Sequence, residues 1–172
     1  LGPFFVGCTA AGLFSPQVSR TTVQWVVFAL AFIFFLFPAN LFIYGVNDIF
    51  DYETDKLNPK KQGYESLLQP EEQKRLMRII IGCLVLIIPL CILLPITASG
   101  SLILFLLLGF GYSAPPVRAK ARPFVDTVFN SLYVMPGLVG YALFAQKLPS
   151  PWLIAAAIAW CMAMHAYSAI PD

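Results

Sequence analysis

VQWVVFALAFIFFLFPANLFIYGV, residues 23–46, is an apolar stretch that runs directly into an acidic segment, NDIFDYETD, at residues 47–55. As an α-helix with a rise of ~1.5 Å per residue, the apolar stretch is long enough to span a hydrocarbon core of ~30 Å. The acidic segment begins where this helix reaches the membrane boundary and meets a charged loop. The pattern predicts a membrane-spanning helix that carries polar groups at one end.

The acidic segment places three carboxylates on one face if the helix continues through it. Asp48, Asp51 and Asp55 stand at positions i, i+3 and i+7. Asn47 joins their face one turn before Asp51. Carboxylates this close repel one another unless a cation neutralises them, and oxygen ligands favour Mg²⁺, or Mn²⁺ in its place. The alternative is a solvated acidic helix end, and we favour the metal site because ionisable groups at a membrane are usually functional.

The composition identifies a polytopic membrane protein. Hydrophobic residues make up 59% of the 172 residues, charged residues make up 12%, and the mean hydropathy is +0.76. A soluble domain averages about 45–50% apolar and about 25% charged residues. The net charge of +2, without a run of Lys and Arg, gives no indication of nucleic-acid binding. The four cysteines lie in apolar stretches without CxxC spacing, which indicates buried free thiols: Cys8, Cys83, Cys91 and Cys161.

Six apolar segments follow one another along the chain, and none requires a β-strand. The fourth is short for a spanning helix and is expected to begin within the preceding connection ITASG, residues 96–100. The expected fold class is therefore an all-α, polytopic membrane helical bundle. The segments cover residues 1–14, 23–46, 77–94, 101–112, 124–144 and 152–170.

The basic residues predict how this bundle is oriented. Nine Lys and Arg lie in or beside the stretches 47–75 and 113–122, whereas the opposite side carries only Arg20 and Lys147. Under the positive-inside rule the two basic stretches face the cytoplasm. Asp172, at the end of the sixth segment, then lies on that side as well. We expect three polar regions to converge on the cytoplasmic face of a protein of the cell membrane.

Basic side chains at this face predict that it handles a diphosphate together with metal ions. The cations of the two loops could contact diphosphate oxygens directly, and their alternative roles are to set topology or to contact lipid headgroups. For Arg118 and Lys120 we favour the phosphate role, because Pro115 and Pro116 stiffen the turn ahead of them. The full set of candidates is Lys60, Lys61, Arg118, Lys120 and Arg122.

These segments resemble the motifs of the UbiA-type intramembrane prenyltransferases. NDIFDYETD matches the first Asp-rich motif, NDxxDxxxD, and YSAPPVRAK, residues 112–120, matches a second cytoplasmic signature. SAIPD, residues 168–172, is similar to the opening of the second Asp-rich motif, DxxxD, cut after its first member. Within the family, PANLFIYGVNDIFDYETDKLNPKK, YSAPPVRAKARPFVD and HAYSAIPD most resemble the lycopene elongases of C50 carotenoid biosynthesis.

The resemblance implies nine transmembrane helices around a central cavity, with a cytoplasmic cap over the active site. We expect residues 1–172 to form a single transmembrane prenyltransferase domain that is truncated at both ends. It would hold about the first six helices, the first of them incomplete, and would lack the last three helices and the rest of the second Asp-rich motif.

The resemblance also implies the reaction and the role of each motif residue. The reaction is Mg²⁺-dependent transfer of a prenyl group from an allylic diphosphate, dimethylallyl diphosphate being expected, to a lipophilic acceptor such as lycopene within the membrane lipids. Asp48, Asp51 and Asp55 would bind the metal with the help of Asn47, and Asp172 would begin a second metal cluster. The family often carries an Arg near the position of Lys60 and Lys61, and its replacement by Lys weakens bidentate phosphate recognition there. The residues that would contact the diphosphate or cap the site are Tyr112, Arg118, Lys120, Lys60 and Lys61.

The expected chemistry requires an allylic cation, which gives the polar and aromatic residues of the spans two interpretations. Metal ions and basic groups would stabilise the departing pyrophosphate, and aromatic faces could stabilise the cation. His165, the only histidine, could accept the terminating proton or form an interhelical hydrogen bond. Asp126 and Asn130, at i and i+4, could likewise line the site or pair between helices. The aromatic candidates, for which simple packing is the alternative, are Phe35, Phe42, Tyr44, Tyr133 and Tyr167.

Other functions make different demands on the same residues. A divalent-cation transporter would need polar residues deep within several spans, yet the second to fourth segments are almost purely apolar at mid-depth. A scaffold with decayed motifs disagrees with the intact acidic and basic segments. An acceptor such as an aromatic acid, a quinone precursor or a glycerol-phosphate lipid remains an alternative within the family. All eleven Lys and Arg lie at loops or helix ends, which favours an apolar polyene over an acceptor that carries a carboxylate.

Overall fold

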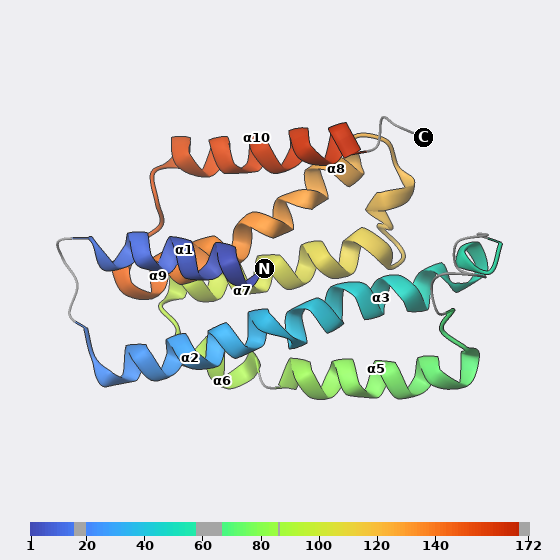
Figure 1. The fold of residues 1–172 in the computed structure, drawn as a ribbon, viewed down its shortest axis with the longest axis horizontal. Coiled ribbons are helices and arrows are strands. Elements are labelled where there is room, and N and C mark those ends of the chain that lie inside the picture. Colours follow the sequence, from blue (N-terminus) through green and yellow to red (C-terminus); the bar gives the residue numbers. More distant parts are fainter. Residues whose placement is uncertain (16–19, 58–66, 86, 169–172) are drawn as a thin grey trace.

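A computed structural model describes residues 1–15, 20–57, 67–85 and 87–168, and every regular element in these ranges is helical. This confirms the all-α class (Figure 1). In chain order the helices are α1 Gly2–Leu13, α2 Thr22–Leu36, α3 Pro38–Asp55, α5 Pro70–Val85, α6 Ile87–Leu93, α7 Ile96–Ser113, η1 Ala119–Ala121, α8 Val125–Phe129, η2 Asn130–Val134, α9 Met135–Ala145 and α10 Pro151–Ser168.

Four helical stretches are long and apolar enough to cross a membrane, and the chain is a multi-pass membrane protein. They are Thr22–Asp55, Pro70–Leu93, Ile96–Ser113 and Val125–Ala145. The third of them begins at Ile96, so the short fourth segment of the sequence does start within the ITASG connection, as expected. The predicted segments at residues 1–14 and 152–170 correspond to α1, which is shorter, and to α10.

A proline divides the first spanning stretch into α2 and α3. Pro38 has no backbone N–H and cannot continue the hydrogen-bond ladder of α2. Close to this break the side-chain Nδ2 of Asn40 donates hydrogen bonds to the carbonyl oxygens of Phe35 and Leu36, at 3.2 and 3.0 Å. Asn40 thus supplies a donor from within the protein beside the break, where the hydrocarbon region offers none. Helix α3, which starts at Pro38, carries the acidic segment.

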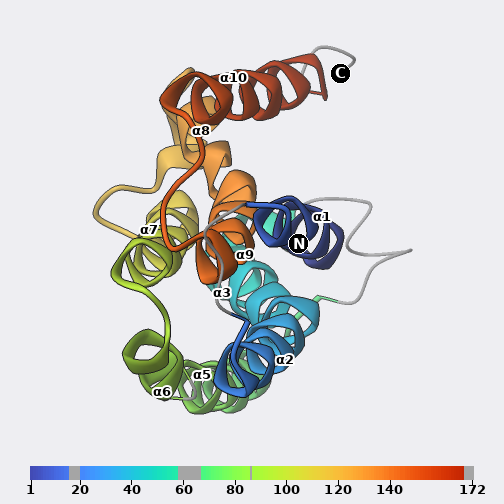
Figure 2. The same ribbon diagram turned by 90° about the vertical axis from the view of Figure 1, so that its left-hand side faces the viewer.

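The polar ends of several helices lie together at one end of the bundle. Figure 1 shows the end of α3, the α7–α8 connection and the end of α10 at its right-hand side, while the start of α2 and the connection into α10 lie at its left. Viewed from that left-hand end, α10 stands beside α8 and apart from α2, α5 and α6 (Figure 2). Since two of the three polar regions meet at this end within the described residues, the expected convergence is confirmed for them, and Asp172 lies outside those residues.

Helices α1 and α9 are packed closely enough to require glycine. The two helices lie side by side in both views (Figures 1 and 2). A Cβ atom at Gly140 of α9 would stand 2.5 Å from the carbonyl oxygen of Phe5 in α1, and one at Gly12 would stand 2.6 Å from the carbonyl oxygen of Tyr141. Small residues of this kind allow membrane helices to approach each other closely, where dispersion forces hold them together.

We expect the substitution Gly140→Ala to lower the thermal stability of the full-length protein in detergent. Because the methyl group would overlap a backbone oxygen, the helices must move apart, at a cost of about 1–3 kcal/mol, which corresponds to a fall of about 2–12 °C in Tm. The matched control is Gly7→Ala in α1, since nothing lies within 4 Å of a Cβ atom there. Equal melting temperatures for the two variants would contradict this account of the interface.

Candidate active site

Helix α3 presents the acidic segment as the sequence predicts. It continues without interruption to Asp55, so Asn47, Asp48, Asp51 and Asp55 lie on consecutive turns of one helix. All four are half-buried, and the side chain of Asp51 is only 16% exposed. The carboxylates are thus held at the end of a spanning helix in a partly dehydrated setting, where a counter-charge stabilises them more than it would in water.

The α7–α8 connection supplies that counter-charge. Lys120 Nζ forms an ion pair with Asp51 Oδ2 and donates a hydrogen bond of 2.8 Å to Asn47 Oδ1. Arg118 Nη2 lies 3.5 Å from Asp51 Oδ1. The side chain of Lys120 is 15% exposed, so this charge is as deeply buried as that of its partner. Residues that are more than sixty positions apart in the sequence therefore form one cluster of opposite charges.

The backbone of the connection adopts a conformation that is uncommon for arginine. Arg118 has φ 41° and ψ 57°, in the left-handed region, and precedes the short helix η1 that carries Lys120. For a residue other than glycine, the left-handed backbone conformation costs ~1–2 kcal/mol. The turn directs Arg118 and Lys120 back toward α3 instead of outward. Backbone conformation and the cluster of charges thus support each other.

Asn47 fixes a second oxygen beside that of Asp51. Its Oδ1 atom accepts hydrogen bonds from Lys120 Nζ and, at 3.0 Å, from the hydroxyl group of Ser113 at the end of α7. Ser113 is buried. The amide oxygen is thereby oriented from two sides and joins the end of α3 to the end of α7.

The cluster has features that fit both a cation and an anion. Its donors on α3 are amide and carboxylate oxygens, the type of ligand that a hard divalent cation takes. Among the described residues no group of three or more His, Cys, Asp or Glu is arranged to hold a metal ion, and Asp51 contacts basic side chains. The buried Nε atom of Arg118 meets no hydrogen-bond acceptor in the described part of the chain. An anion at this point would satisfy it.

Some predicted site residues fall elsewhere. Lys60, Lys61 and Asp172 lie outside the described residues. Arg122, at the end of the connection, is exposed. Tyr112 is half-buried on the last turn of α7, and the charges of both Asp126 and Asp51 act on its phenol group.

A second polar group joins α8 and α10. His165 Nε2 lies 3.1 Å from Asp126 Oδ2. Asp126 Oδ1 accepts hydrogen bonds from the backbone N–H and the hydroxyl group of Thr127, at 2.6 and 3.1 Å. Of the two interpretations open for these residues, the interhelical hydrogen bond is therefore present for His165 and Asp126. It leaves both side chains partly exposed, at 21% and 24%.

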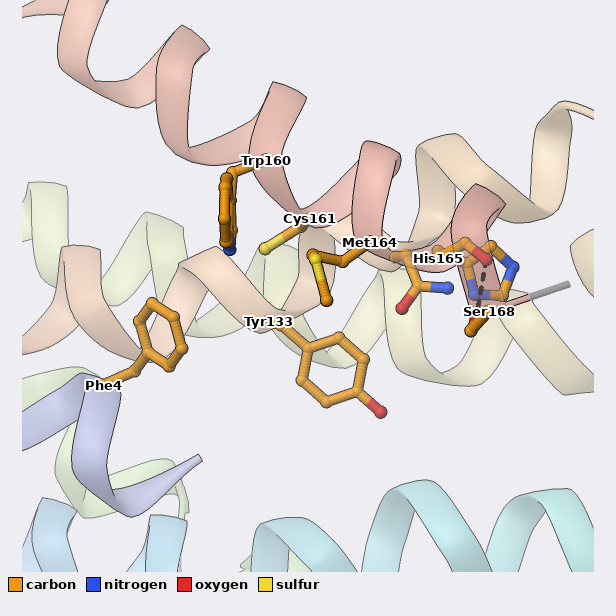
Figure 3. Close-up of a pocket in the computed structure, with 8 residues that line it drawn as sticks. Phe4, Tyr133, Trp160, Cys161, Met164, His165 and Ser168 are labelled. Carbon is orange, nitrogen blue, oxygen red and sulfur yellow. Dashed lines mark hydrogen bonds between the residues drawn. The ribbon is translucent and has the colours of Figure 1, made fainter. Parts of the chain in front are cut away.

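The same histidine lines a cavity of about 350 Å³ between α1, η2 and α10 (Figure 3). Asn130, which is buried, and Tyr133 also line it. Tyr167 is 71% exposed and is not among the lining residues found in the described ranges. The complete lining is Phe4, Asn130, Tyr133, Trp160, Cys161, Met164, His165 and Ser168.

The aromatic candidates lie in different surroundings, and Tyr44 and Tyr167 are exposed. Phe35 and Phe42 are buried in the core, where both rings contact Phe105 at centroid distances of 5.6 and 6.5 Å. The packing alternative is correct for these two. Tyr133 lines the cavity and interacts with Tyr44 of α3, so a pair of tyrosines spans the space between η2 and α3.

Sequence reasoning missed residues that hold the functional side chains in place. Ser113 follows Tyr112 within the YSAPPVRAK segment, but no spacing rule connects it with Asn47. Thr127 follows Asp126, and a Thr directly after an Asp is a signal for local side-chain hydrogen bonding that could have been used. Trp160 and Met164 are four residues apart on α10, and Met164 is one residue before His165. Their spacing would have indicated a shared face with Cys161 and His165.

The fold and the charged cluster together indicate the class of protein to which this chain belongs. The described helices form a membrane bundle whose acidic and basic side chains gather at one end. The model of the UbiA prenyltransferase family matches residues 3–172. The chain belongs to the UbiA prenyltransferase family.

Individual relatives agree with this assignment. A lycopene elongase/hydratase from Haloarcula japonica is 38% identical over 177 residues, which cover 99% of this chain and 56% of the relative. One from Haloferax volcanii is 40% identical over 141 residues, which cover 82% of this chain and 46% of the relative. The chain spans about half the length of the curated relatives that it matches.

A solved structure shows the same fold. It is that of a UbiA homolog from Archaeoglobus fulgidus bound to DMAPP and Mg²⁺. The TM-score is 0.75 at 21% sequence identity, and the match covers 99% of this chain and 58% of that chain. The order and arrangement of the helices described above are therefore those of a known membrane bundle.

Proposed function

We propose that this protein transfers a prenyl group from dimethylallyl diphosphate to a polyene, lycopene or a close relative, with the help of Mg²⁺, in the biosynthesis of C50 carotenoids. The observation that carries the proposal is the cluster of Asn47, Asp51, Arg118 and Lys120, in which ligands suited to a divalent cation stand beside cations suited to a diphosphate. Family membership supports the reaction type, and the names of the relatives support the acceptor.

The roles of the residues follow from their chemistry. When bound, Mg²⁺ supplies positive charge that stabilises the departing pyrophosphate, and Asn47, Asp48, Asp51 and Asp55 would hold it, with Asp172 contributing from the end of the sixth segment. Arg118 and Lys120 bind diphosphate oxygens directly, and the unsatisfied Nε atom of Arg118 gains an acceptor. Lys60, Lys61 and Tyr112 complete the diphosphate contacts.

After the C–O bond breaks, the apolar spans provide a dry environment for the allylic cation. The allylic cation must be kept from water and strong nucleophiles, and the residues around the cavity are mainly aromatic or apolar. The faces of Tyr133 and Trp160 can stabilise the cation by ~0.5–2 kcal/mol each. No metal or basic group is needed for the acceptor itself, because a polyene offers only its terminal double bond.

The proposal places the reaction at the cytoplasmic side of the cell membrane. The cluster lies at the end of the bundle where the α7–α8 connection and the end of α3 meet (Figure 1). Nine of the eleven Lys and Arg lie in or beside residues 47–75 and 113–122, the two stretches that the positive-inside rule assigns to the cytoplasm. A water-soluble diphosphate would thus reach the site from the cytoplasm, while the acceptor enters from the lipid.

We expect the full-length protein to produce new pigments in a lycopene-producing bacterial host. The pigments should be heavier than lycopene by one or two five-carbon units, as determined by liquid chromatography and mass spectrometry. Membranes from the same cells should form them only when Mg²⁺ and dimethylallyl diphosphate are added, and EDTA should stop the reaction. Unchanged lycopene, together with prenylation of 4-hydroxybenzoate by the same membranes, would contradict the proposed acceptor.

A further inference from the structure

The pair of His165 and Asp126 is built like a base with an orienting carboxylate. Asp126 is held on one oxygen by two hydrogen bonds from Thr127 and meets His165 with the other. In the neutral tautomer that carries its proton on Nε2, His165 donates to Asp126, and Nδ1 retains a free lone pair. An imidazole that is oriented in this way by a carboxylate is a common arrangement for proton transfer, because the carboxylate also stabilises the imidazolium ion that forms.

The surroundings of His165 suit a hydrocarbon substrate. His165 shares its cavity with the side chains of Phe4, Tyr133, Trp160 and Met164 (Figure 3). A second cavity of about 170 Å³, lined almost wholly by apolar side chains of α1, α9 and α10, also includes Phe4. The two cavities therefore adjoin at this residue. A long apolar chain lying against α10 would have one end beside His165.

The pair is also connected with the charged cluster. Tyr112, on the last turn of α7, feels the charges of both Asp126 and Asp51. The carboxylate that orients His165 and the carboxylate proposed to bind the metal thus both act on one phenol group. A substrate that has its diphosphate near Asp51 could therefore extend past Tyr112 toward the pair of Asp126 and His165.

We propose that His165 is the proton acceptor that ends the transfer reaction and that Asp126 positions it; the inference rests on the proposed function. The C–O bond of the donor breaks, and its electron pair leaves with pyrophosphate. The terminal double bond of the acceptor supplies the electron pair of the new C–C bond, and the positive charge passes to the neighbouring acceptor carbon. His165 Nδ1 then takes a proton from a carbon next to this charge, and the C–H electrons form a new double bond.

The proton that His165 accepts can also come from a water molecule instead of from a carbon. If a water molecule adds to the acceptor cation, its oxygen forms the new C–O bond and Nδ1 takes the proton that the oxygen releases, which gives a tertiary alcohol. Either way, one pyrophosphate and one proton are released for each prenyl group transferred. The two sources differ in the mass of the product by one water molecule, so mass spectrometry of the pigment distinguishes them.

The test separates a proton acceptor from a purely structural hydrogen bond. The substitution His165→Gln keeps an N–H donor for Asp126 but removes the basic nitrogen. With lycopene and dimethylallyl diphosphate in membranes that contain the full-length protein, we expect pigment formation to fall by about 100-fold, which is the lower range for general base catalysis. Pyrophosphate release should fall much less, because bond ionisation precedes the proton transfer. The ratio of elongated pigment to pyrophosphate is the decisive reading.

Controls make each result decisive. Trp152→Phe, at the exposed start of the same helix, should keep the wild-type ratio. Asp126→Asn keeps an acceptor for the imidazole but removes the negative charge. We therefore expect the ratio of pigment to pyrophosphate to fall in this variant too, but by less than in His165→Gln. A wild-type ratio of pigment to pyrophosphate in His165→Gln would overturn the proposal, whether the two products are both unchanged or both reduced by the same factor. If the wild-type protein releases no pyrophosphate and forms no pigment, the proposed function itself is wrong.

Discussion

The substitution Asp51→Ala will reduce prenyl transfer by about 1,000-fold while leaving the protein in the membrane. The reduction is large because the carboxylate of Asp51 contacts the side chains of both Arg118 and Lys120, and because removing one group that stabilises transition-state charge typically costs about 100- to 1,000-fold in rate. Transfer is measured as pyrophosphate release and pigment formation at saturating lycopene, with the amount of protein determined by immunoblotting of the membranes.

The matched control for this variant is Glu53→Ala. Glu53 lies two residues further along α3, and its side chain is 75% exposed and pairs with Lys56. Both variants remove one negative charge from the same helix end, so any difference between them reports the position of Asp51 and not the net charge. We expect the Glu53 variant to keep most of its activity. A wild-type rate for Asp51→Ala, or full activity of the wild-type protein in EDTA, would contradict the metal role of the acidic segment.

The substitution Lys120→Met will lower kcat/KM for the diphosphate donor by about 10- to 100-fold. A charge-assisted hydrogen bond contributes ~1.5–3 kcal/mol, and Met retains most of the volume of Lys without its charge. Because Lys120 contacts Asp51 and Asn47, the variant also tests whether this cluster acts as a unit. Initial rates at varied donor concentration, with lycopene in excess, give the two kinetic constants.

The control here is Lys147→Met, in the exposed connection before α10. It removes an equal charge at the opposite end of the bundle, so it should leave the kinetic constants for the donor unchanged. A loss of activity in the Lys120 variant that is confined to the KM for lycopene would contradict the diphosphate role. Equal kinetic constants for the two variants would contradict it as well.

The sequence predicts the helices and the acidic face well because both depend on local patterns. Apolar runs of membrane length identify the spans, and the spacing of Asp48, Asp51 and Asp55 requires only that α3 continue to Asp55, which it does. The break at Pro38 is also local, although the capping role of Asn40 is not indicated by its position alone.

Contacts between distant segments are what the sequence does not predict. The hydrogen bond from Ser113 to Asn47 and the bond between His165 and Asp126 depend on how α3, α7, α8 and α10 pack. His165 pairs with Asp126 and also lines the cavity, and neither contact can be derived from its position in the sequence. The left-handed conformation of Arg118 is equally hidden, because arginine adopts it rarely.

The close packing of α1 on α9 sets a waiting time during synthesis. About 120 residues separate the end of α1 from the start of α9, and at about 5–20 residues per second their production takes ~6–25 s. During that interval α1 must remain in the lipid without the helix that later covers it. It can do so because its hydroxyl group on the buried face, that of Thr9, already donates a 2.7 Å hydrogen bond to the carbonyl oxygen of Phe5 in the same helix. The buried hydroxyl group of α1 thus has its acceptor within its own helix before α9 is made.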